Sequence, residues 1–287
     1  MTTTTRTIEL EDATLVYDVH EPPTPGDRRP LFVFGSPMGA SGFAQLLEHI
    51  TDRTVITYDP RGMERSTRDP KRPITVEVHA EDYHRVVEAA GLGPVDAFGS
   101  SGGARCALHW VLAHPEDLVT LVAHEPPANA LLEDADVLAK VNADITATYQ
   151  REGFGPAMAK FIQLVMHQGV LTEDYLDRPA PDPAAFGLPT EDDGSRDDLL
   201  LGGNLEMPPY VPDGDALRRS PVRIVPAVGA EGEGGIAWRG GQAVARLLGV
   251  EPTVLPGDHG GFAASEWSPG NDPAAFAARL LQVLDRA

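Results

Sequence analysis

The chain has 287 residues, 42% of them hydrophobic and 23% charged, which is ordinary for a soluble globular protein with a sizeable core. The formal net charge of −20 argues against nucleic acid and anionic membrane surfaces as partners. A single cysteine excludes an intrachain disulfide and a cysteine-based metal cluster. Since no secretory segment or membrane-length apolar run is recognisable, we expect a cytoplasmic monomer or homodimer whose partner is a small-molecule substrate.

Short apolar runs alternate with amphipathic segments over most of the chain. Residues 31–34 are wholly apolar, which is typical of a strand covered on both faces. Residues 76–90 place apolar or small side chains at helical spacing, and Gly91 suits the cap that follows. Further strands are predicted at 7–10, 14–20, 55–58, 95–98, 118–123, 222–228 and 252–255, and further helices at 43–50, 104–113, 236–248 and from Pro273 onward. This alternation predicts the α/β class, with a mostly parallel eight-stranded sheet and helices on both faces.

The alternation breaks between residues 128 and 220, where helical patterns at 131–147 and 156–167 precede an irregular acidic stretch. We predict that residues 127–215 form a helical cap inserted after the sixth strand, and that 1–126 and 216–287 form the core domain. Such a cap would lie above the carboxyl ends of the strands, where open α/β sheets bind ligands. Apolar cap side chains either line a pocket there or pack against the core: Met158, Phe161, Met166, Met207 and Tyr210.

A nucleophile elbow is predicted between the strand at 95–98 and the helix at 104–113. The sequence there contains Gly99-x-Ser101-x-Gly103. A tight strand–turn–helix junction holds one hydroxyl out at its tip and leaves no room for side chains two residues before and after it. The pattern therefore predicts Ser101 as a nucleophile.

A serine nucleophile needs a base and an acid that orients the base. His259 follows the last strand in a glycine-flanked loop and comes after Ser101 in the chain, as the elbow pattern requires. Two places offer the acid. Glu125 ends the sixth strand and is stiffened by prolines, whereas Glu231 and Glu233 lie between glycines after the seventh. A carboxylate that orients an imidazole must be fixed, so we favour Glu125 and leave the two glutamates open as alternatives.

The oxyanion formed by the attack needs two preset donors. One predicted donor is the N–H of Gly102, at the start of the helix after the elbow, where the helix dipole assists. The other is the N–H of Ser36, in the loop after the strand at 31–34. This chemistry requires neither a cofactor nor a metal. His79 and His84 share a helix without metal-ligand spacing, and we expect both to be solvated.

Four motifs, which follow one another along the chain in the expected order, resemble those of the α/β-hydrolase fold family. Residues 34–39 are similar to the oxyanion loop His-Gly-x-Pro-x-Gly, with Phe34 in place of His, and 58–66 to Asp-x-Arg-Gly-x-Gly-x-Ser, with Glu64 in place of Gly. Residues 99–103 match the elbow and 256–259 the histidine loop. The resemblance covers the whole chain and implies a cap between the sixth and seventh strands.

One departure from the family pattern concerns the acid. The family usually places Asp three residues after the position of Gly229, where this chain has Gly232. The stretch at 123–125 is instead similar to the end of the sixth strand in haloalkane dehalogenases, some of which use Glu there, and this favours Glu125. Dehalogenases and epoxide hydrolases need an Asp nucleophile, so Ser101 disfavours those two activities.

The sequence therefore predicts a serine hydrolase that cleaves an ester, thioester or lactone through an acyl-enzyme on Ser101. A cofactor-free perhydrolase or a carbon–carbon bond hydrolase could use the same residues. The alternative from another class is a small-ligand binding protein that turns nothing over. Neither the substrate nor the oligomeric state follows from the sequence.

Overall fold

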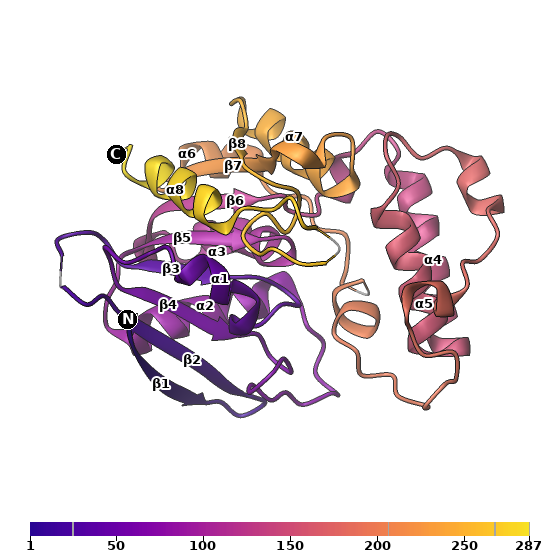
Figure 1. The fold of residues 1–287 in the computed structure, drawn as a ribbon, viewed down its shortest axis with the longest axis horizontal. Helices are drawn as coiled ribbons and strands as arrows, with labels where there is room; N and C mark the ends of the chain where they lie inside the picture. Colours follow the sequence, from indigo (N-terminus) through magenta and orange to yellow (C-terminus); the bar gives the residue numbers. More distant parts are fainter. Residues whose placement is uncertain (25, 206, 267, 287) are drawn as a thin grey trace.

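The structure is a computed structural model that describes residues 1–24, 26–205, 207–266 and 268–286. Eight strands form one sheet in the order β1-β2-β4-β3-β5-β6-β7-β8 (Figure 1). The strands are β1 (Thr2–Glu9), β2 (Thr14–Glu21), β3 (Leu31–Phe34), β4 (Val55–Asp59), β5 (Val95–Ser100), β6 (Leu118–His124), β7 (Arg223–Gly229) and β8 (Thr253–Leu255). β2 pairs antiparallel with β1 and β4, and every other pairing is parallel. The predicted fold class is therefore confirmed.

Helices cover both faces of the sheet, because successive side chains of a buried strand point to opposite sides. In β3, Phe32 and Phe34 join the apolar cluster under one set of helices, whereas Leu31 and Val33 join the cluster under the other. The first set is α2 (Val76–Ala90), α3 (Gly102–Ala113), α6 (Gly214–Arg219) and α7 (Ile236–Leu248). The second is α1 (Ala44–Leu47) and α8 (Pro273–Leu284). No helix in the described part of the chain is long and apolar enough to cross a membrane.

The first strand begins earlier than the predicted 7–10. β1 already pairs with β2 at Thr2, and most of its side chains are exposed. An edge strand needs no buried face, and threonine is β-branched and favours extended backbone. The first residues of this strand are polar threonines, so a pattern of apolar residues does not mark them as a strand.

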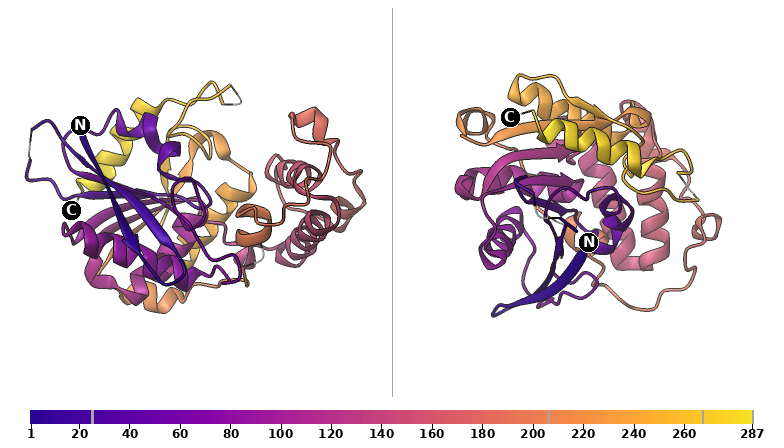
Figure 2. Two further views of the ribbon diagram at one scale, coloured as in Figure 1. Left: turned by 90° about the horizontal axis from the view of Figure 1, so that it is seen from below. Right: turned by 60° about the vertical axis from the view of Figure 1, so that its left-hand side comes forward.

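The segment between β6 and α6 contributes no strand to the sheet within its described residues, and lies beside the sheet (Figures 1 and 2). Its two long helices are α4 (Ala135–Glu152) and α5 (Phe154–Val165), shifted by a few residues from the predicted 131–147 and 156–167. They share an apolar cluster of their own, which includes Leu138, Ile145 and Leu164. We refer to residues 127–215 as the cap, whose boundaries remain predictions.

Three residues of the predicted cap contact segments that follow the carboxyl ends of strands. Asn204 bonds to Ser36 after β3, and the Asp197 carbonyl accepts a hydrogen bond from Arg68, which follows β4. The Pro208 carbonyl accepts another from Arg105, in the first turns of α3. Figure 1 shows both chain termini on the far side of the sheet from α4 and α5.

The apolar cap residues singled out in the sequence are mostly packed. Met158 and Phe161 lie against the cluster of α4 and α5, while Met207 and Tyr210 lie against the main core cluster. Met166 is 67% exposed. These positions fit the interpretation in which the apolar residues hold the cap together and fix it to the core.

Candidate active site

Ser101 occupies the sharp turn between β5 and α3, with φ 54° and ψ −128°. Such a conformation is strained for a residue with a side chain and persists only where its surroundings enforce it. A Cβ on Gly99 would lie 2.9 Å from Phe34 Cε2, and one on Gly103 would lie 2.9 Å from the backbone of Gly35. The crowding explains why both flanking positions are glycine. The local geometry is that of a nucleophile elbow.

The two adjacent serines of the elbow differ in their surroundings. Ser100 is buried, and its Oγ lies 3.3 Å from Nδ1 of the buried His124. Ser101 is partly exposed, and its backbone N–H donates to the His124 carbonyl over 2.9 Å. Ser101 therefore carries the hydroxyl that a substrate can reach.

The carboxylate that meets His259 is Glu125, whose Oε2 lies 2.6 Å from His259 Nδ1. Glu125 is 1% exposed, and its Oε1 accepts a 2.8 Å hydrogen bond from the Gly229 N–H of β7. Its own N–H donates to the Ala227 carbonyl over 2.9 Å. The Glu125 side chain is thus fixed from the neighbouring strand, while 46% of the His259 side chain remains exposed.

Burial by itself would raise the pKa of the Glu125 carboxyl. The hydrogen bond from His259, the nearby imidazole of His124 and the N–H of Gly229 outweigh burial and hold that pKa below its ordinary value. Glu125 is therefore an anion at neutral pH. An anion at His259 Nδ1 selects the tautomer that leaves Nε2 free to accept a proton.

Glu231 and Glu233, the alternative acids, are both exposed. Gly232 between them occupies the position where the related family usually has Asp. A Cβ added there would lie 3.2 Å from Glu125 Oε1. A side chain at position 232 would therefore enter the space that the Glu125 carboxylate occupies. Gly232 has no side chain and leaves this space to Glu125, which reaches it from the end of β6.

The predicted oxyanion loop lies directly against the elbow. Ser36 is 4% exposed, and a Cβ on Gly102 would lie 2.5 Å from the Ser36 carbonyl oxygen. Only glycine permits this approach, which places the backbones of the two predicted donors side by side. The loop is anchored on its other side, where the Asp59 carboxylate at the end of β4 accepts a 2.9 Å hydrogen bond from the Ala40 N–H.

A cap residue that the sequence analysis did not identify reaches the same place. Asn204 ends a turn of π-helix at Leu200–Asn204, and its Nδ2 donates to Ser36 Oγ over 3.0 Å. The same nitrogen lies 3.3 Å from the position of a Cβ on Gly102. Because 168 residues separate Ser36 from Asn204, no local pattern could have signalled this contact.

Glu64 stands where the related family has glycine, and the backbone explains that preference. Its φ of 45° lies in the left-handed region that glycine adopts without strain. The Glu64 side chain compensates by accepting a 2.5 Å hydrogen bond from Ser41 Oγ. This contact ties the loop after β4 to the segment that follows the oxyanion loop.

Asp258 precedes His259 but serves the loop itself. Its Oδ2 accepts a 2.5 Å hydrogen bond from Ser268 Oγ, and its Oδ1 accepts from Asn271 Nδ2 and the Gly260 N–H over 2.9 and 2.8 Å. The carboxylate of Asp258 is thus committed to holding the loop that carries His259.

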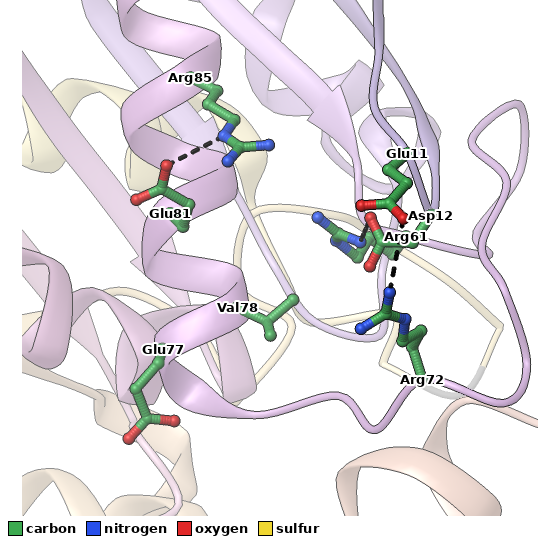
Figure 3. Close-up of a pocket in the computed structure, with 8 residues that line it drawn as sticks. All are labelled: Glu11, Asp12, Arg61, Arg72, Glu77, Val78, Glu81 and Arg85. Atoms are coloured by element: carbon green, nitrogen blue, oxygen red, sulfur yellow. Dashed lines mark hydrogen bonds and ion pairs between the residues drawn. The ribbon is translucent and has the colours of Figure 1, made fainter.

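A hollow elsewhere on the surface has no comparable chemistry. It lies between α2 and the turn that joins β1 to β2 (Figure 3), and its lining residues are Glu11, Asp12, Arg61, Arg72, Glu77, Val78, Glu81 and Arg85. Each arginine pairs with a carboxylate: Arg61 with Asp12, Arg72 with Glu11, and Arg85 with Glu81. The three arginines offset three of the four carboxylates, and none of the predicted catalytic residues lines this hollow.

The prediction that His79 is solvated is wrong. His79 is 1% exposed and stacks on Tyr83 with 6.2 Å between ring centroids. Burial lowers the pKa of His79 to about 4, so the ring is neutral. The helix buries this face because α2 packs on α3, which sequence spacing within one helix does not reveal. His84 faces outward, with 26% of its side chain exposed.

Fold and site together define a hydrolase of the α/β class. The chain belongs to the α/β-hydrolase fold family, whose pattern matches residues 31–184. An uncharacterised hydrolase of Bacillus subtilis, YraK, is 28% identical over 240 residues, which cover 81% of this chain and 82% of YraK.

Solved structures share the fold at lower identity. A thermophilic esterase from Thermogutta terrifontis superposes with a TM-score of 0.67 at 17% identity, over 100% of this chain and 99% of the esterase. Proline iminopeptidase from Mycobacterium smegmatis superposes with a TM-score of 0.61 at 20% identity, over 99% and 98% of the two chains.

Proposed function

We propose that this protein is a serine hydrolase that cleaves an ester, thioester or lactone of a small organic molecule through an acyl-enzyme on Ser101. The observation that carries the proposal is the 2.6 Å contact between Glu125 Oε2 and His259 Nδ1, in a chain whose elbow presents Ser101. The name of the Thermogutta relative, an esterase, is in keeping with this choice of substrate.

In the first half of the reaction, Ser101 Oγ attacks the substrate carbonyl while His259 Nε2 takes the hydroxyl proton. Glu125 stabilises the imidazolium that forms and remains an anion itself. The N–H groups of Ser36 and Gly102 stabilise the oxyanion of the tetrahedral intermediate. The intermediate then collapses as His259 returns the proton to the leaving oxygen or sulfur, and Ser101 is left acylated.

The second half repeats these roles with water. His259 takes a proton from the water that attacks the acyl carbon, and then protonates Ser101 Oγ as the acid product leaves. The reaction balances with the substrate, one water molecule and the side chains named above. We further propose that the cap, residues 127–215, closes over Ser101, and that Asn204 fixes the oxyanion loop through Ser36 Oγ.

The test is turnover of a panel of chromogenic short-chain esters, thioesters and lactones by wild type and by Ser101→Ala. We expect the variant to lose about 10³-fold or more of kcat. Ser100→Ala, the matched control in the same elbow, should keep turnover within about threefold because Ser100 is buried and its Oγ lies against the buried His124.

Retention of ester turnover by Ser101→Ala would contradict the proposal. Turnover by the wild type only when hydrogen peroxide or a β-diketone is supplied would favour a perhydrolase or a carbon–carbon bond hydrolase. Binding of every substrate without turnover would point to a binding protein.

A further inference from the structure

The outer edge of β1 is the longer of the two free edges of the sheet. β1 has eight residues, Thr2–Glu9, and pairs with β2 on one side only, whereas the strand at the opposite edge, β8, has three. Figure 1 shows β1 at the margin of the sheet, with no described element on its outer side. A strand edge presents a row of backbone N–H and C=O groups that another chain can pair with.

The ladder between β1 and β2 determines which backbone groups face outward. Antiparallel residue pairs alternate between pairs that exchange hydrogen bonds and pairs whose backbone groups point away from each other. On β2, the N–H of Val16 donates to Oγ of Ser66, which follows β4, and Val16 is paired with Thr7. The Val16–Thr7 pair is therefore of the second kind. The N–H and C=O groups of Thr7 point away from β2, as do those of Thr3 and Thr5 at the same period.

β1 is held against β2 along its whole length. The register is unbroken over all eight residues. Thr5 Oγ1 donates a 2.5 Å hydrogen bond to Asp18 Oδ1, and Thr14 Oγ1 donates a 2.8 Å hydrogen bond to Glu9 Oε2. The free edge is thus ordered within the single chain, which lowers the entropic cost of pairing it with another strand.

The composition of β1 does not protect this edge. Natural edge strands are commonly blocked by lysine, proline or a bulge, and Thr2–Glu9 has neither residue and no bulge. In a chain of net charge −20, the strand carries only Arg6 and Glu9, so its own charge is zero. Threonine pairs well with threonine across neighbouring strands. The edge therefore suits a strand that is itself uncharged and rich in threonine, and β1 of a second copy has this composition.

We propose that β1 pairs antiparallel with β1 of a second copy, which joins the two sheets in a homodimer. A two-fold axis normal to the sheet relates the two strands. An axis at Thr5 places Thr5 opposite its counterpart and Thr3 opposite Thr7, so that all three outward-facing residues exchange hydrogen bonds with the second copy. An axis at Arg6 would place two arginines opposite each other, which is unfavourable, and an axis at Thr7 would pair fewer residues.

The dimer leaves the candidate active site free. Strands β2, β4 and β3 separate β1 from β5, so the free edge lies four strand spacings, about 19 Å, from the strand that leads into the elbow. We therefore expect the same turnover per chain in monomer and dimer. The pairing does not depend on the proposed function.

The test is sedimentation equilibrium of the whole chain at about 1–200 µM, a range suited to a small edge-to-edge interface. We expect wild type to shift from monomer to dimer across this range. Thr5→Pro removes an outward N–H that an edge strand can lose without unfolding, and should raise the dissociation constant at least about tenfold. Thr5→Val is the matched control, because it loses the hydroxyl contact with Asp18 but keeps the N–H, and should dimerise as wild type does.

Circular dichroism checks that Thr5→Pro remains folded. A wild type that stays monomeric throughout the range would overturn the proposal. Equal dissociation constants for wild type and folded Thr5→Pro would also overturn it, since the contact would then lie elsewhere.

Oxidative cross-linking tests the register without relying on the proline variant. Thr5→Cys should form a covalent dimer, because paired residues at the axis have Cα atoms about 5.5 Å apart, within reach of a disulfide. Thr7→Cys is the matched control and should not cross-link, since its two copies would lie about 14 Å apart. The native Cys106 is buried and does not compete. A cross-link in Thr7→Cys alone, or in neither variant, would contradict pairing centred on Thr5.

Discussion

Strand β6 carries a carboxylate just beyond each end, and each carboxylate holds a histidine by Nδ1. Asp117 precedes the strand and lies 2.9 Å from His84, whereas Glu125 follows it and lies 2.6 Å from His259. Both carboxylates are buried and fixed by an N–H, that of the Trp110 indole at one end and that of Gly229 at the other.

The two pairs differ in what accompanies the histidine. Ser101 stands in the strained elbow at the carboxyl edge of the sheet, which carries the Glu125 pair. His84 instead stacks on His114, close to Glu116. The same carboxylate–imidazole contact therefore lies beside a candidate nucleophile at one edge of the sheet and beside a second imidazole at the other. Neighbouring groups decide the chemistry, and the pair alone does not.

Glu125 is the position where a substitution should have the largest effect on the proposed reaction. We expect Glu125→Gln to lower kcat by about 10²–10⁴-fold, because the amide no longer stabilises the imidazolium of His259. Steady-state kinetics on an ester that the wild type hydrolyses measures the loss.

The matched controls are Glu231→Gln and Glu233→Gln, since both side chains are exposed in the segment after β7. They should leave kcat within about twofold. A large loss in either control, with little effect of Glu125→Gln, would move the acid to the loop after β7.

His79 is a buried histidine that no carboxylate contacts through a hydrogen bond or ion pair among the described residues. Neither ring nitrogen of His79 has a hydrogen-bond partner among the described residues, and burial lowers its pKa to about 4. Between the ordinary histidine pKa of about 6.5 and pH 4, the unfolded chain binds a proton that the folded chain does not. Stability therefore falls as pH falls through this window, by up to about 3 kcal/mol from this residue.

His79→Phe should remove that loss, so the free energy of unfolding of the variant should fall less steeply than that of wild type from pH 7 to pH 4. Urea unfolding at several pH values measures both curves. Two parallel curves would show that His79 does not titrate differently in the folded and unfolded states.

A smaller effect is expected at Asn204, where the cap touches the oxyanion loop. Asn204→Ala removes one hydrogen bond to Ser36 Oγ and should lower kcat by about tenfold, with less change in KM. Asn204→Asp should lower kcat further, because it places a negative charge beside the developing oxyanion.

Asn142→Ala, in helix α4 of the cap, serves as the control for loss of an amide that does not contact Ser36. Equal kcat values in wild type, Asn204→Ala and Asn204→Asp would show that Asn204 does not support the reaction.

The core of the fold could be predicted from sequence because its physical causes are local. Apolar runs such as 31–34 mark buried strands, and Gly99 and Gly103 mark a turn too tight for side chains. The choice of Glu125 rested on the stiffness of its backbone and on a family resemblance. The contact between Glu125 and His259 could not be predicted from sequence, because it depends on how the fold places Glu125 against β7.

What sequence reasoning missed lies between elements that are far apart in the chain. His84 and His114 come from two segments, so the spacing of histidines within α2 gave no sign of their stacking. His79 was predicted to be solvated, but the packing of α2 on α3 buries it. Asn204 reaches Ser36 from the cap, and its role could be found only once the two were placed together.

The central claim is that Ser101 is the nucleophile, and covalent labelling tests it most directly. The protein is treated with a fluorophosphonate, digested and mapped by mass spectrometry. We expect a single adduct on Ser101 in wild type and none in Ser101→Ala. An adduct on another residue, or its persistence in Ser101→Ala, would show that Ser101 is not the nucleophile.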